Sequence, residues 1–341
     1  MPNYILNNEN AILYECGYTC DNALFLRLNG AGYLITDARY DIEARELVNG
    51  GVSVICASDL QSAARGLLRK LKIKRLEFDP ASFSVASFEA LSKKSKASFK
   101  PVINLSQKMR EVKDAFALLK LKHSAKVGKE CFRQMAEYIS LQGDGKTEKE
   151  LHKKAVEIFS DYGDRELSFN PILAINKNAA KAHALPSNER LKMGDLVLLD
   201  AGVRIDGYCS DCTRTAEFNE SFSFDKAQSF KDPKKQEIYN LVLSAQKAAI
   251  EAIKPGIKAS EVDAVARNVI AKAGYDRQFF HSTGHGVGLD IHELPRISKA
   301  SNTVLKEGMV FSVEPGVYIE GEFGVRIEDV VVVTKTGCEI L

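Results

Sequence analysis

The sequence contains no tryptophan, no large excess of charge of either sign, and no apolar run that approaches the roughly 18 residues of a membrane span. Its 47 basic and 45 acidic residues nearly cancel, whereas proteins dedicated to nucleic acids or membrane surfaces usually carry a basic excess. We therefore expect no nucleic-acid partner and no association with a membrane. The content of 45% hydrophobic and 27% charged residues is typical of a globular chain and argues against general disorder.

Cysteine is sparse and shows no pairing pattern. Seven cysteines, an odd number, are dispersed along the chain, and residues 1–10 lack the charged-then-apolar pattern of a secretion signal. Disulfide frameworks are typical of short secreted domains in oxidising compartments. The pattern therefore predicts reduced thiols and a cytoplasmic location.

The first part of the chain alternates short apolar runs with a helical pattern. Residues 33–36, 52–55 and 76–78 read as strands, and residues 59–71 read as a helix. Such alternation is typical of a small α/β domain. A chain of 341 residues is long enough for two domains, and we place the boundary between residues 108 and 109.

The second part contains the same order of elements twice. A long helix is predicted from Met109 to about Gln142, and a second begins at Thr147, whose capping box is completed by Glu150. The order then recurs as helices at 234–253 and from Ser260 onward, with strands at 196–200, 207–218, 309–313 and 325–333. The capped helix starts and the acidic residues on strands recur at an offset of about 113 residues, which indicates an internal duplication.

Acidic residues occur in pairs on the predicted hairpins. Asp200 and Asp211 flank a turn that ends in Asp-Gly, and their odd separation puts both side chains on one face of the sheet. Glu314 and Glu328 occupy the corresponding places in the second repeat. Four buried carboxylates without basic partners would repel one another, so bound divalent cations would remove the conflict. The alternative is four unrelated surface acids.

Histidine distribution favours the metal hypothesis. Four of the six histidines lie at 183, 281, 285 and 292, within the duplicated part, and the last three are interspersed with glycine. An imidazole with four carboxylates suits a pair of ions such as Mn²⁺, Co²⁺ or Fe²⁺. The pair Cys209 and Cys212 also invites a four-thiolate zinc site with Cys16 and Cys20. We reject that site because residues three apart on a strand face opposite sides.

These motifs together resemble a known family. The runs Asp200-Ala-Gly202, Gly207 to Thr215, His281 to His292, Glu314-Pro-Gly316 and Arg326-Ile-Glu328-Asp329 are similar to those of the Xaa-Pro peptidases, aminopeptidase P and prolidase. The resemblance implies an α+β protein. Residues 109–341 would form a pita-bread (creatinase/aminopeptidase) catalytic domain with an internal pseudo-two-fold duplication, and residues 1–108 a smaller α/β domain of the creatinase type, ribonuclease H-like.

The resemblance also implies roles for individual residues. Two divalent metal ions per subunit, Mn²⁺ first and Co²⁺, Zn²⁺ or Fe²⁺ as alternatives, would be ligated by Asp200, Asp211, His285, Glu314 and Glu328. Glu314 would also act as general acid and base. His183 and His292 would contact the substrate and assist catalysis, Arg326 and Arg296 would bind substrate, and His281 would support the ligands.

The implied activity is hydrolysis of the peptide bond between an N-terminal residue and proline in small peptides, by a protein expected to be a homodimer. Three alternatives stay open. The protein is a prolidase that acts on Xaa-Pro dipeptides, a methionine-type aminopeptidase, or a non-catalytic binding protein of the same fold.

Overall fold

The computed structural model describes residues 2–341, and the chain forms two compact units that divide between Arg110 and Glu111. Both contain helices and strands, as the α+β prediction requires. Among the described residues, none of the helices combines the length and apolarity that crossing a bilayer requires.

The first unit is built on one mixed sheet whose strand order is β4-β3-β2-β1-β5-β6. Its strands are β1 (Tyr4–Leu6), β2 (Ala23–Leu28), β3 (Ala31–Thr36), β4 (Val52–Cys56), β5 (Arg75–Phe78) and β6 (Ser98–Pro101). Its helices are α1 (Glu9–Cys16), α2 (Asp41–Leu47), α3 (Leu60–Lys70), α4 (Val85–Ser92) and α5 (Leu105–Met109). Alternate residues of β2 enter two different cores, with Leu24 and Leu26 in one and Phe25 in the other, so helices cover both sheet faces.

The predicted helix from Met109 was wrong at its start. Helix α6 (Ala115–Gln142) begins after Asp114, whose side chain accepts a hydrogen bond from the Ala117 amide at 2.8 Å. Asp114 is a strong N-cap, and the residues before it are extended because Val112 pairs with Met309.

The second unit repeats one arrangement twice, which confirms the predicted duplication. The first copy comprises α6, α7 (Glu148–Phe159), β8 (Ile172–Ile175), β9 (Leu196–Ala201), β10 (Val203–Ile205), β11 (Tyr208–Cys209) and β12 (Cys212–Glu217). The second comprises α8 (Pro233–Ala252), α9 (Ala259–Lys272), β13 (Gly284–Gly286), β15 (Val310–Val313), β16 (Gly316–Ile319), β17 (Phe323–Arg326) and β18 (Asp329–Val333). Antiparallel β8-β9-β12 corresponds to antiparallel β13-β15-β18, and each copy inserts one hairpin, β10–β11 or β16–β17.

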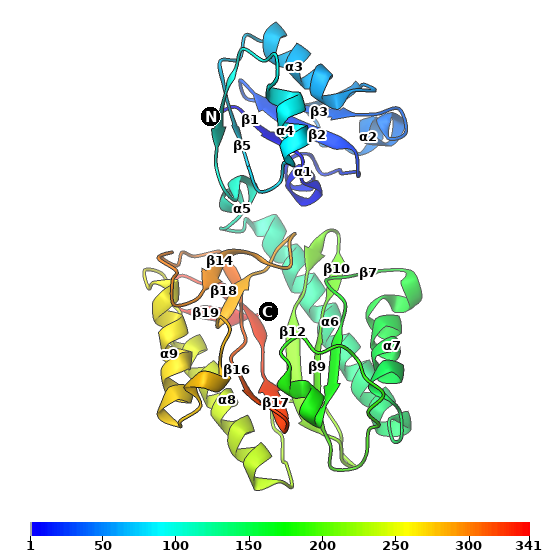
Figure 1. Ribbon diagram of the computed structural model, residues 1–341, viewed down its shortest axis with the longest axis vertical. Coiled ribbons are helices and arrows are strands. Elements are labelled where there is room, and N and C mark those ends of the chain that lie inside the picture. Colours follow the sequence, from blue (N-terminus) through cyan, green and yellow to red (C-terminus); the bar gives the residue numbers. More distant parts are fainter. Residues whose placement is uncertain (1) are drawn as a thin grey trace. The chain divides into compact units, whose positions relative to one another are not determined.

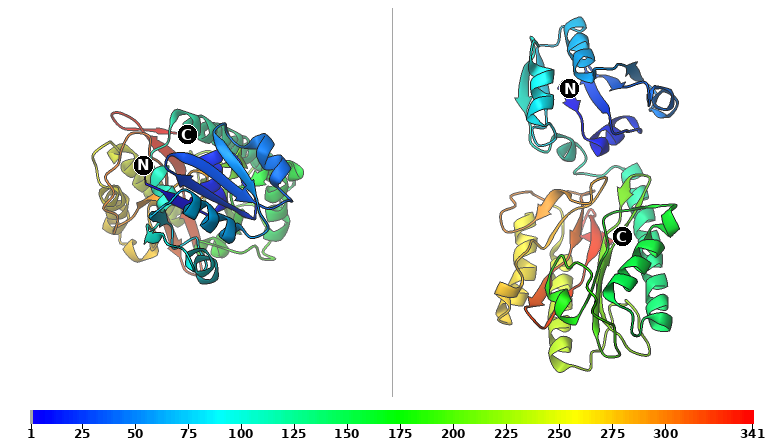
Figure 2. Two further views of the ribbon diagram at one scale, coloured as in Figure 1. Left: turned by 90° about the horizontal axis from the view of Figure 1, so that it is seen from above. Right: turned by 45° about the vertical axis from the view of Figure 1, so that its right-hand side comes forward.

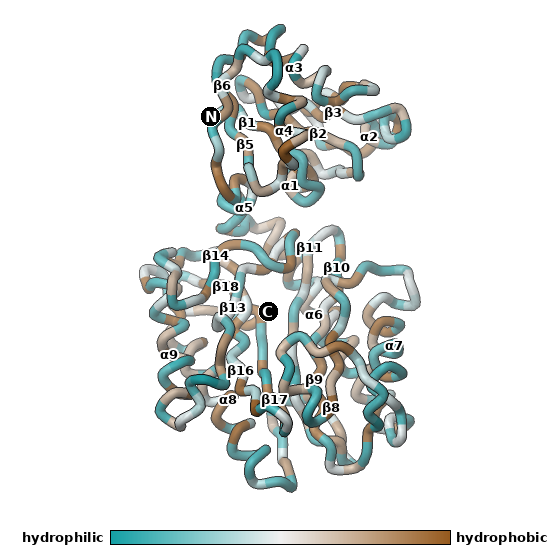
Figure 3. The backbone as a smooth tube through the Cα atoms, viewed as in Figure 1, coloured by the Kyte–Doolittle hydropathy of each residue, from teal (hydrophilic) through white to brown (hydrophobic). Residues whose placement is uncertain are grey.

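The helices of this unit lie outside its strands. Figure 1 shows α6 and α7 on one side and α8 and α9 on the other, and the turned view in Figure 2 shows the same separation. Brown and teal segments alternate along α7 and α9 in Figure 3, as expected for helices with one buried face. The remaining strands are β7 (Glu166–Leu167), β14 (Glu293–Ile297) and β19 (Cys338–Ile340).

The two helix starts differ in their caps. The box at the start of α7 is confirmed, since Thr147 N donates to Glu150 Oε2 at 2.9 Å and Glu150 N donates to Thr147 Oγ1 at 3.2 Å. The predicted start at Ser260 was wrong, because α9 begins at Ala259 and its cap is Lys258. Only half of a box forms there, from Lys258 N to Glu261 Oε2 at 2.9 Å.

Strand β9 is a buried, mainly apolar strand that also contains Asp200. Val197 and Leu199 pack into the core beneath α6 and α7, whereas Leu196 and Leu198 pack into the other core of the unit. Asp200 follows the alternation of Leu196 and Leu198, so its side chain points away from the first-copy helices.

Candidate metal centre

Three of the four acids predicted as ligands lie where a strand is interrupted. Asp211 stands between β11 and β12, Glu314 between β15 and β16, and Glu328 between β17 and β18. Asp200 lies within β9, and its Cα pairs with that of Thr213. Because Asp211 precedes Thr213 by two residues, it shares the sheet face of Asp200, diagonally across from it.

The continuous strands predicted at 207–218 and 325–333 are each broken at the acid. The hairpins β10–β11 and β16–β17 belong to sheets other than those of β12 and β18, so the chain changes sheet at Asp211 and Glu328. The breaks in the second copy are bridged by backbone hydrogen bonds. Glu314 N donates to Thr283 O at 2.8 Å and Glu328 N to Thr213 O at 3.1 Å, which holds both glutamates in place.

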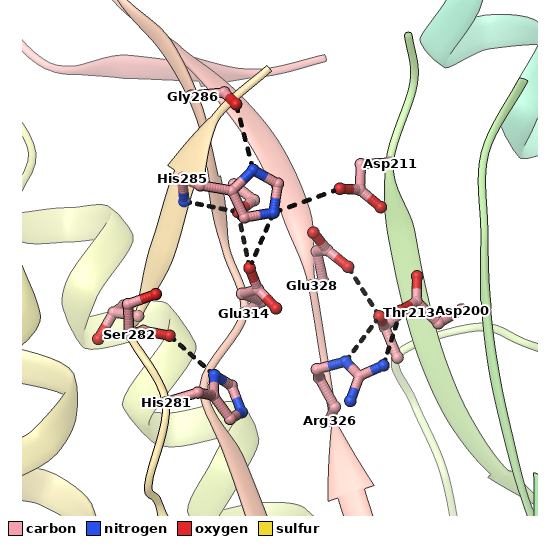
Figure 4. Close-up of polar contacts among 12 residues, drawn as sticks. Asp200, Asp211, Thr213, His281, Ser282, His285, Gly286, Glu314, Arg326 and Glu328 are labelled. Atoms are coloured by element: carbon pink, nitrogen blue, oxygen red, sulfur yellow. Dashed lines mark hydrogen bonds and ion pairs between the residues drawn. The ribbon is translucent and has the colours of Figure 1, made fainter. Parts of the chain in front are cut away.

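Side chains from both copies converge on one point (Figure 4). His285 Nε2 lies 3.2 Å from Glu314 Oε1 and 3.6 Å from Asp211 Oδ2. Each of three residues, Asp211, His285 and Glu328, offers one ligand atom, and these atoms lie within 4.8 Å of one another. One metal ion could span this spacing.

Two carboxylates in the centre leave one oxygen each without a partner. Glu328 Oε2 accepts from Thr213 Oγ1 at 2.7 Å and Asp200 Oδ2 accepts from Arg326 Nη2 at 2.7 Å. Glu328 Oε1 and Asp200 Oδ1 are buried and have no hydrogen-bond partner among residues 2–341. Buried oxygens of this kind are costly unless a ligand meets them.

The acids resist ionisation in the absence of cations. Burial, followed by the negative charges of Glu328, Asp200 and Glu314, raises the pKa of Asp211 well above its usual value. Burial and the charges of Glu314 and Asp200 raise the pKa of Glu328 in the same way. Burial also raises the pKa of Asp200, although Arg326 partly opposes the shift. Such a group of carboxylates is electrostatically unsatisfied without added positive charge.

Glu314 behaves differently because it faces His285. Burial alone would raise its pKa, but the ion pair with His285 and the positive charge of Arg326 lower it to about 2. The same pair raises the pKa of His285, against the effect of burial. His285 Nδ1 lies 3.1 Å from Gly286 O, which can only accept, so Nδ1 carries a proton and Nε2 faces the acids.

The donor set therefore fits divalent metal ions. It combines carboxylate oxygens with one imidazole nitrogen whose other nitrogen is held by a carbonyl, the usual arrangement of a metal-binding histidine. Two buried oxygens without partners and two strongly raised pKa values are what cation binding would relieve.

The two cysteines that flank Asp211 each contact a backbone carbonyl. Cys209 Sγ faces Leu289 O at 3.8 Å and Cys212 Sγ faces Glu328 O at 3.7 Å. Within the part of the chain described, Asp211, His285 and Glu328 are the group with the spacing of metal ligands.

Arg326 lies beside the acids and joins them to a second network. Its Nη2 donates to Asp200, its Nε donates to Thr213 Oγ1 at 3.0 Å, and its Nη1 donates to Tyr318 Oη at 2.8 Å. Tyr318 Oη also lies 2.9 Å from His281 Nε2. His281 Nδ1 faces Ser282 O at 2.8 Å, so Tyr318 donates to Nε2. Arg326 thus contacts Asp200 directly, and Tyr318 links Arg326 to His281.

We expect Tyr318→Phe to reduce the free energy of unfolding by about 1–3 kcal/mol, because Arg326 and His281 each lose a buried partner. Urea unfolding measures the change. Tyr162→Phe is the matched control, since Tyr162 is 73% exposed, and it should change stability little. Equal effects of the two substitutions would contradict the network.

The three remaining predicted residues, His183, His292 and Arg296, are exposed. The rings of His285 and His292 lie with centroids 4.2 Å apart. Partial burial and the positive charge of His285 lower the pKa of His292, although the negative charge of Glu314 opposes the shift. Arg296 also pairs across the strands with His285, which puts both side chains on one face.

Sequence reasoning missed the hydroxyl groups that orient the ligands. Thr213 holds Glu328, and Ser312 Oγ donates to Glu314 Oε1 at 3.0 Å. Tyr318 was missed as well. Thr213 and Ser312 each lie two residues from an acid along a strand, so the alternation that placed the acids on one face contained the signal.

The metal-free protein is expected to lose stability as the pH rises from about 4 toward neutrality. The raised pKa values of Asp211 and Glu328 mean that the folded state keeps protons that the unfolded chain has released. Asp211 and Glu328 therefore stabilise the folded protein fully when the pH is below their pKa in the unfolded chain. This stabilisation is lost as the pH rises through their higher pKa in the folded protein. Glu314 acts in the opposite sense, but only as the pH falls toward its pKa of about 2.

Urea midpoints in EDTA at pH 5 and pH 8 measure this dependence. Asp211→Asn with Glu328→Gln should flatten it, and Asp206→Asn, at an exposed acid, should leave it unchanged. Stabilisation by added Mn²⁺ should instead grow with pH, because ligands bind metal in their deprotonated forms. A midpoint in EDTA that does not fall with pH would contradict the charge arrangement.

Each of the two units matches the model of a known protein family. Residues 120–335 match the model of metallopeptidase family M24, and residues 2–112 match that of the creatinase/prolidase N-terminal domain. An uncharacterized peptidase of Staphylococcus aureus (strain bovine RF122 / ET3-1) is 38% identical over 235 residues, which are 69% of this chain and 63% of that protein. The match thus spans less than two thirds of the relative's length.

Solved structures are similar over nearly the whole chain. An Xaa-Pro dipeptidase from Bacillus anthracis has a TM-score of 0.89 and 32% identity, with 99% of this chain and 92% of that chain covered. An X-Pro aminopeptidase from Thermotoga maritima MSB8 has a TM-score of 0.87 and 30% identity, with 100% of this chain and 95% of that chain covered. With its duplicated second unit and its cluster of acids around His285, the chain belongs to metallopeptidase family M24.

Proposed function

We propose that this protein is a dinuclear-metal exopeptidase that hydrolyses the bond between an N-terminal residue and proline. The observation that carries the proposal is the gathering of three buried acids and the half-buried Glu314 around His285, with one oxygen each of Asp200 and Glu328 lacking a partner. The domains of this enzyme would be residues 1–108 and 109–341, with the chemistry in the second.

Asp200, Asp211, His285, Glu314 and Glu328 would hold two divalent ions, Mn²⁺ first. Ions bound there would supply positive charge to polarise the scissile carbonyl and to lower the pKa of a water. The raised pKa values of Asp211 and Glu328 support this role, because both carboxylates lie among like charges.

The chain's own groups would carry the proton and stabilise developing charge. Glu314 is ionised at neutral pH, so a carboxylate oxygen can accept the proton of the attacking water and return it to the departing nitrogen. His292, whose pKa is lowered, would be neutral and could donate an N–H to the oxygen of the scissile carbonyl, and His183 could do the same. Arg326 would hold Asp200 in its ligating orientation.

Specificity for proline rests on the relatives rather than on a contact in this chain. The similar structures include one named an Xaa-Pro dipeptidase and one named an X-Pro aminopeptidase. Proline fixes its own φ and lacks an amide N–H, so its peptide bond requires a dedicated site.

A panel of Ala-Pro, Ala-Pro-Ala and Met-Ala-Ala tests the proposal with metal-free protein to which Mn²⁺, Co²⁺ or Zn²⁺ is added. Turnover of Ala-Pro-Ala is the expected result. Turnover of Met-Ala-Ala alone would indicate a methionine-type enzyme, and no turnover with any metal would favour a binding protein. Asp211→Asn protein, purified in parallel, controls for contaminating peptidases.

A prolidase is the second candidate, and Arg296 favours it. This exposed arginine shares a sheet face with His285 and acts on the charge of His292, so it could hold the free carboxylate of a dipeptide. If so, Ala-Pro is turned over and Ala-Pro-Ala is not. Arg296→Lys should then raise KM for Ala-Pro about tenfold, because Lys cannot form the bidentate pair.

Two further properties belong to the proposal. Seven free thiols support a reducing, cytoplasmic location. The resemblance to Xaa-Pro peptidases supports a homodimer, which light scattering of the purified protein would test.

A further inference from the structure

Glu148 is a fully buried acid that the proposed chemistry does not use. It lies in the first turn of α7, beside the exposed capping residue Glu150. Its Oε1 accepts a hydrogen bond from Ile175 N at 2.6 Å, and its Oε2 accepts from Asn178 Nδ2 at 2.8 Å and from Ser187 N at 2.7 Å. A carboxylate without access to water requires such donors, so all three bonds matter to its stability there.

The three donors belong to segment 175–187, which carries His183. Ile175 and Ser187 are its two ends, and the chain between them has only the short 3-10 turn η2 (Asn176–Ala180). Asn178 Nδ2 also donates to Leu185 O at 3.0 Å, and Arg326 Nη1 donates to Ala182 O at 3.2 Å. The side chain of His183 is exposed, whereas these hydrogen bonds hold the backbone on either side of it.

We propose that Glu148 is a positioning residue, which holds segment 175–187 and thereby fixes the position of His183. The proposal rests on the substrate-contacting role of His183 in the proposed function. Residues 181–187 have no strand or helix to fix them, so the carboxylate takes the place of a sheet ladder.

The second copy of the fold also buries an acid beside a histidine-bearing segment, although this segment precedes β13 whereas residues 175–187 continue from β8. Asp263, fully buried in α9, accepts from Thr283 N at 3.1 Å and from Thr283 Oγ1 at 2.8 Å. Its partner Arg267 donates to Phe279 O at 2.8 Å and to His281 O at 2.9 Å. In both copies, a buried acid of the second helix thus ties down a segment that carries a histidine, at different places in the two repeats.

Glu148→Gln tests the proposal, because the amide nitrogen of Gln would face N–H donors on at least one side. Glu150→Gln is the matched control, since Gln also completes a capping box and Glu150 has no bond to segment 175–187. We expect Glu148→Gln to lower kcat/KM for Ala-Pro or Ala-Pro-Ala at least tenfold, and Glu150→Gln to leave it unchanged.

Combination with His183→Ala separates positioning from general destabilisation. If Glu148 acts through His183, Glu148→Gln should have less than a twofold further effect in the His183→Ala protein. Similar losses in both backgrounds would overturn the proposal. Should Glu148→Gln not fold, Asn178→Ala removes only the side chain that ties Glu148 to Leu185 O, and the same cycle applies.

Hydrogen exchange of the metal-free protein gives an answer that needs no turnover. The amides of Ile175 and Ser187 should exchange at least tenfold faster in Glu148→Gln than in the wild type, and at unchanged rates in Glu150→Gln. Unchanged exchange would overturn the clamp. If exchange accelerates although the wild type cleaves no peptide, the clamp stands and the proposed function fails.

Discussion

Asp211→Asn is expected to abolish the binding of one metal ion and to lower peptide turnover by about 10³-fold or more, which corresponds to about 4 kcal/mol. Asp211 lies in the centre, with Oδ2 at 3.6 Å from His285 Nε2 and within ligand spacing of Glu328. Asn keeps the volume but removes the charge that a cation requires. Calorimetric titration of metal-free protein with Mn²⁺ measures the binding, and hydrolysis of the preferred Xaa-Pro peptide measures turnover.

Asp206→Asn is the matched control for this substitution. Asp206 is an exposed acid on the turn between β10 and β11, five residues before Asp211 along the chain. It should bind metal and turn over peptide as the wild type does. Full metal loading and near-normal turnover in Asp211→Asn would show that this carboxylate is not a ligand.

Glu314→Gln is expected to reduce kcat by about 10²–10⁴-fold, the range that a general acid–base residue contributes. A second consequence concerns His285 in the metal-free protein. Because Glu314 raises the pKa of His285 against the effect of burial, its replacement should lower that pKa, which histidine NMR titration detects.

Glu320→Gln, at an exposed acid six positions along the chain, is the control and should change neither kcat nor the titration of His285. The two readouts separate two roles of Glu314. If Glu314→Gln lowers the pKa of His285 but turnover at saturating Mn²⁺ is unchanged, the ion pair between Glu314 and His285 is structural. Glu314 then has no role in the chemistry.

Much of the second unit could be predicted from local patterns. The capping box at Thr147 and Glu150 depends only on residues within one helical turn, so the sequence states it directly. The duplication was also readable, because corresponding elements recur in order. The start of α6 was less accessible, since residues 111–113 are extended through a pairing of Val112 with Met309, far along the chain.

The candidate site, too, could be predicted from local patterns only in part. The odd separation of Asp200 and Asp211 across the predicted turn predicted that both acids share one face of the sheet. The breaks at Asp211 and Glu328 could not be foreseen, because they arise where the chain changes from one sheet to another. The roles of Tyr318 and Glu148 depend on partners distant in sequence, Arg326 and Ser187, and no local pattern encodes such contacts.

The most direct test of the account is the number of Mn²⁺ ions that must bind each chain before Xaa-Pro hydrolysis reaches its plateau. Metal-free protein should be inactive, activity should appear as Mn²⁺ is added, and the plateau should coincide with two bound ions per chain. Hydrolysis by protein shown to be free of metal, or no hydrolysis of any Xaa-Pro peptide once two ions are bound, would contradict the account.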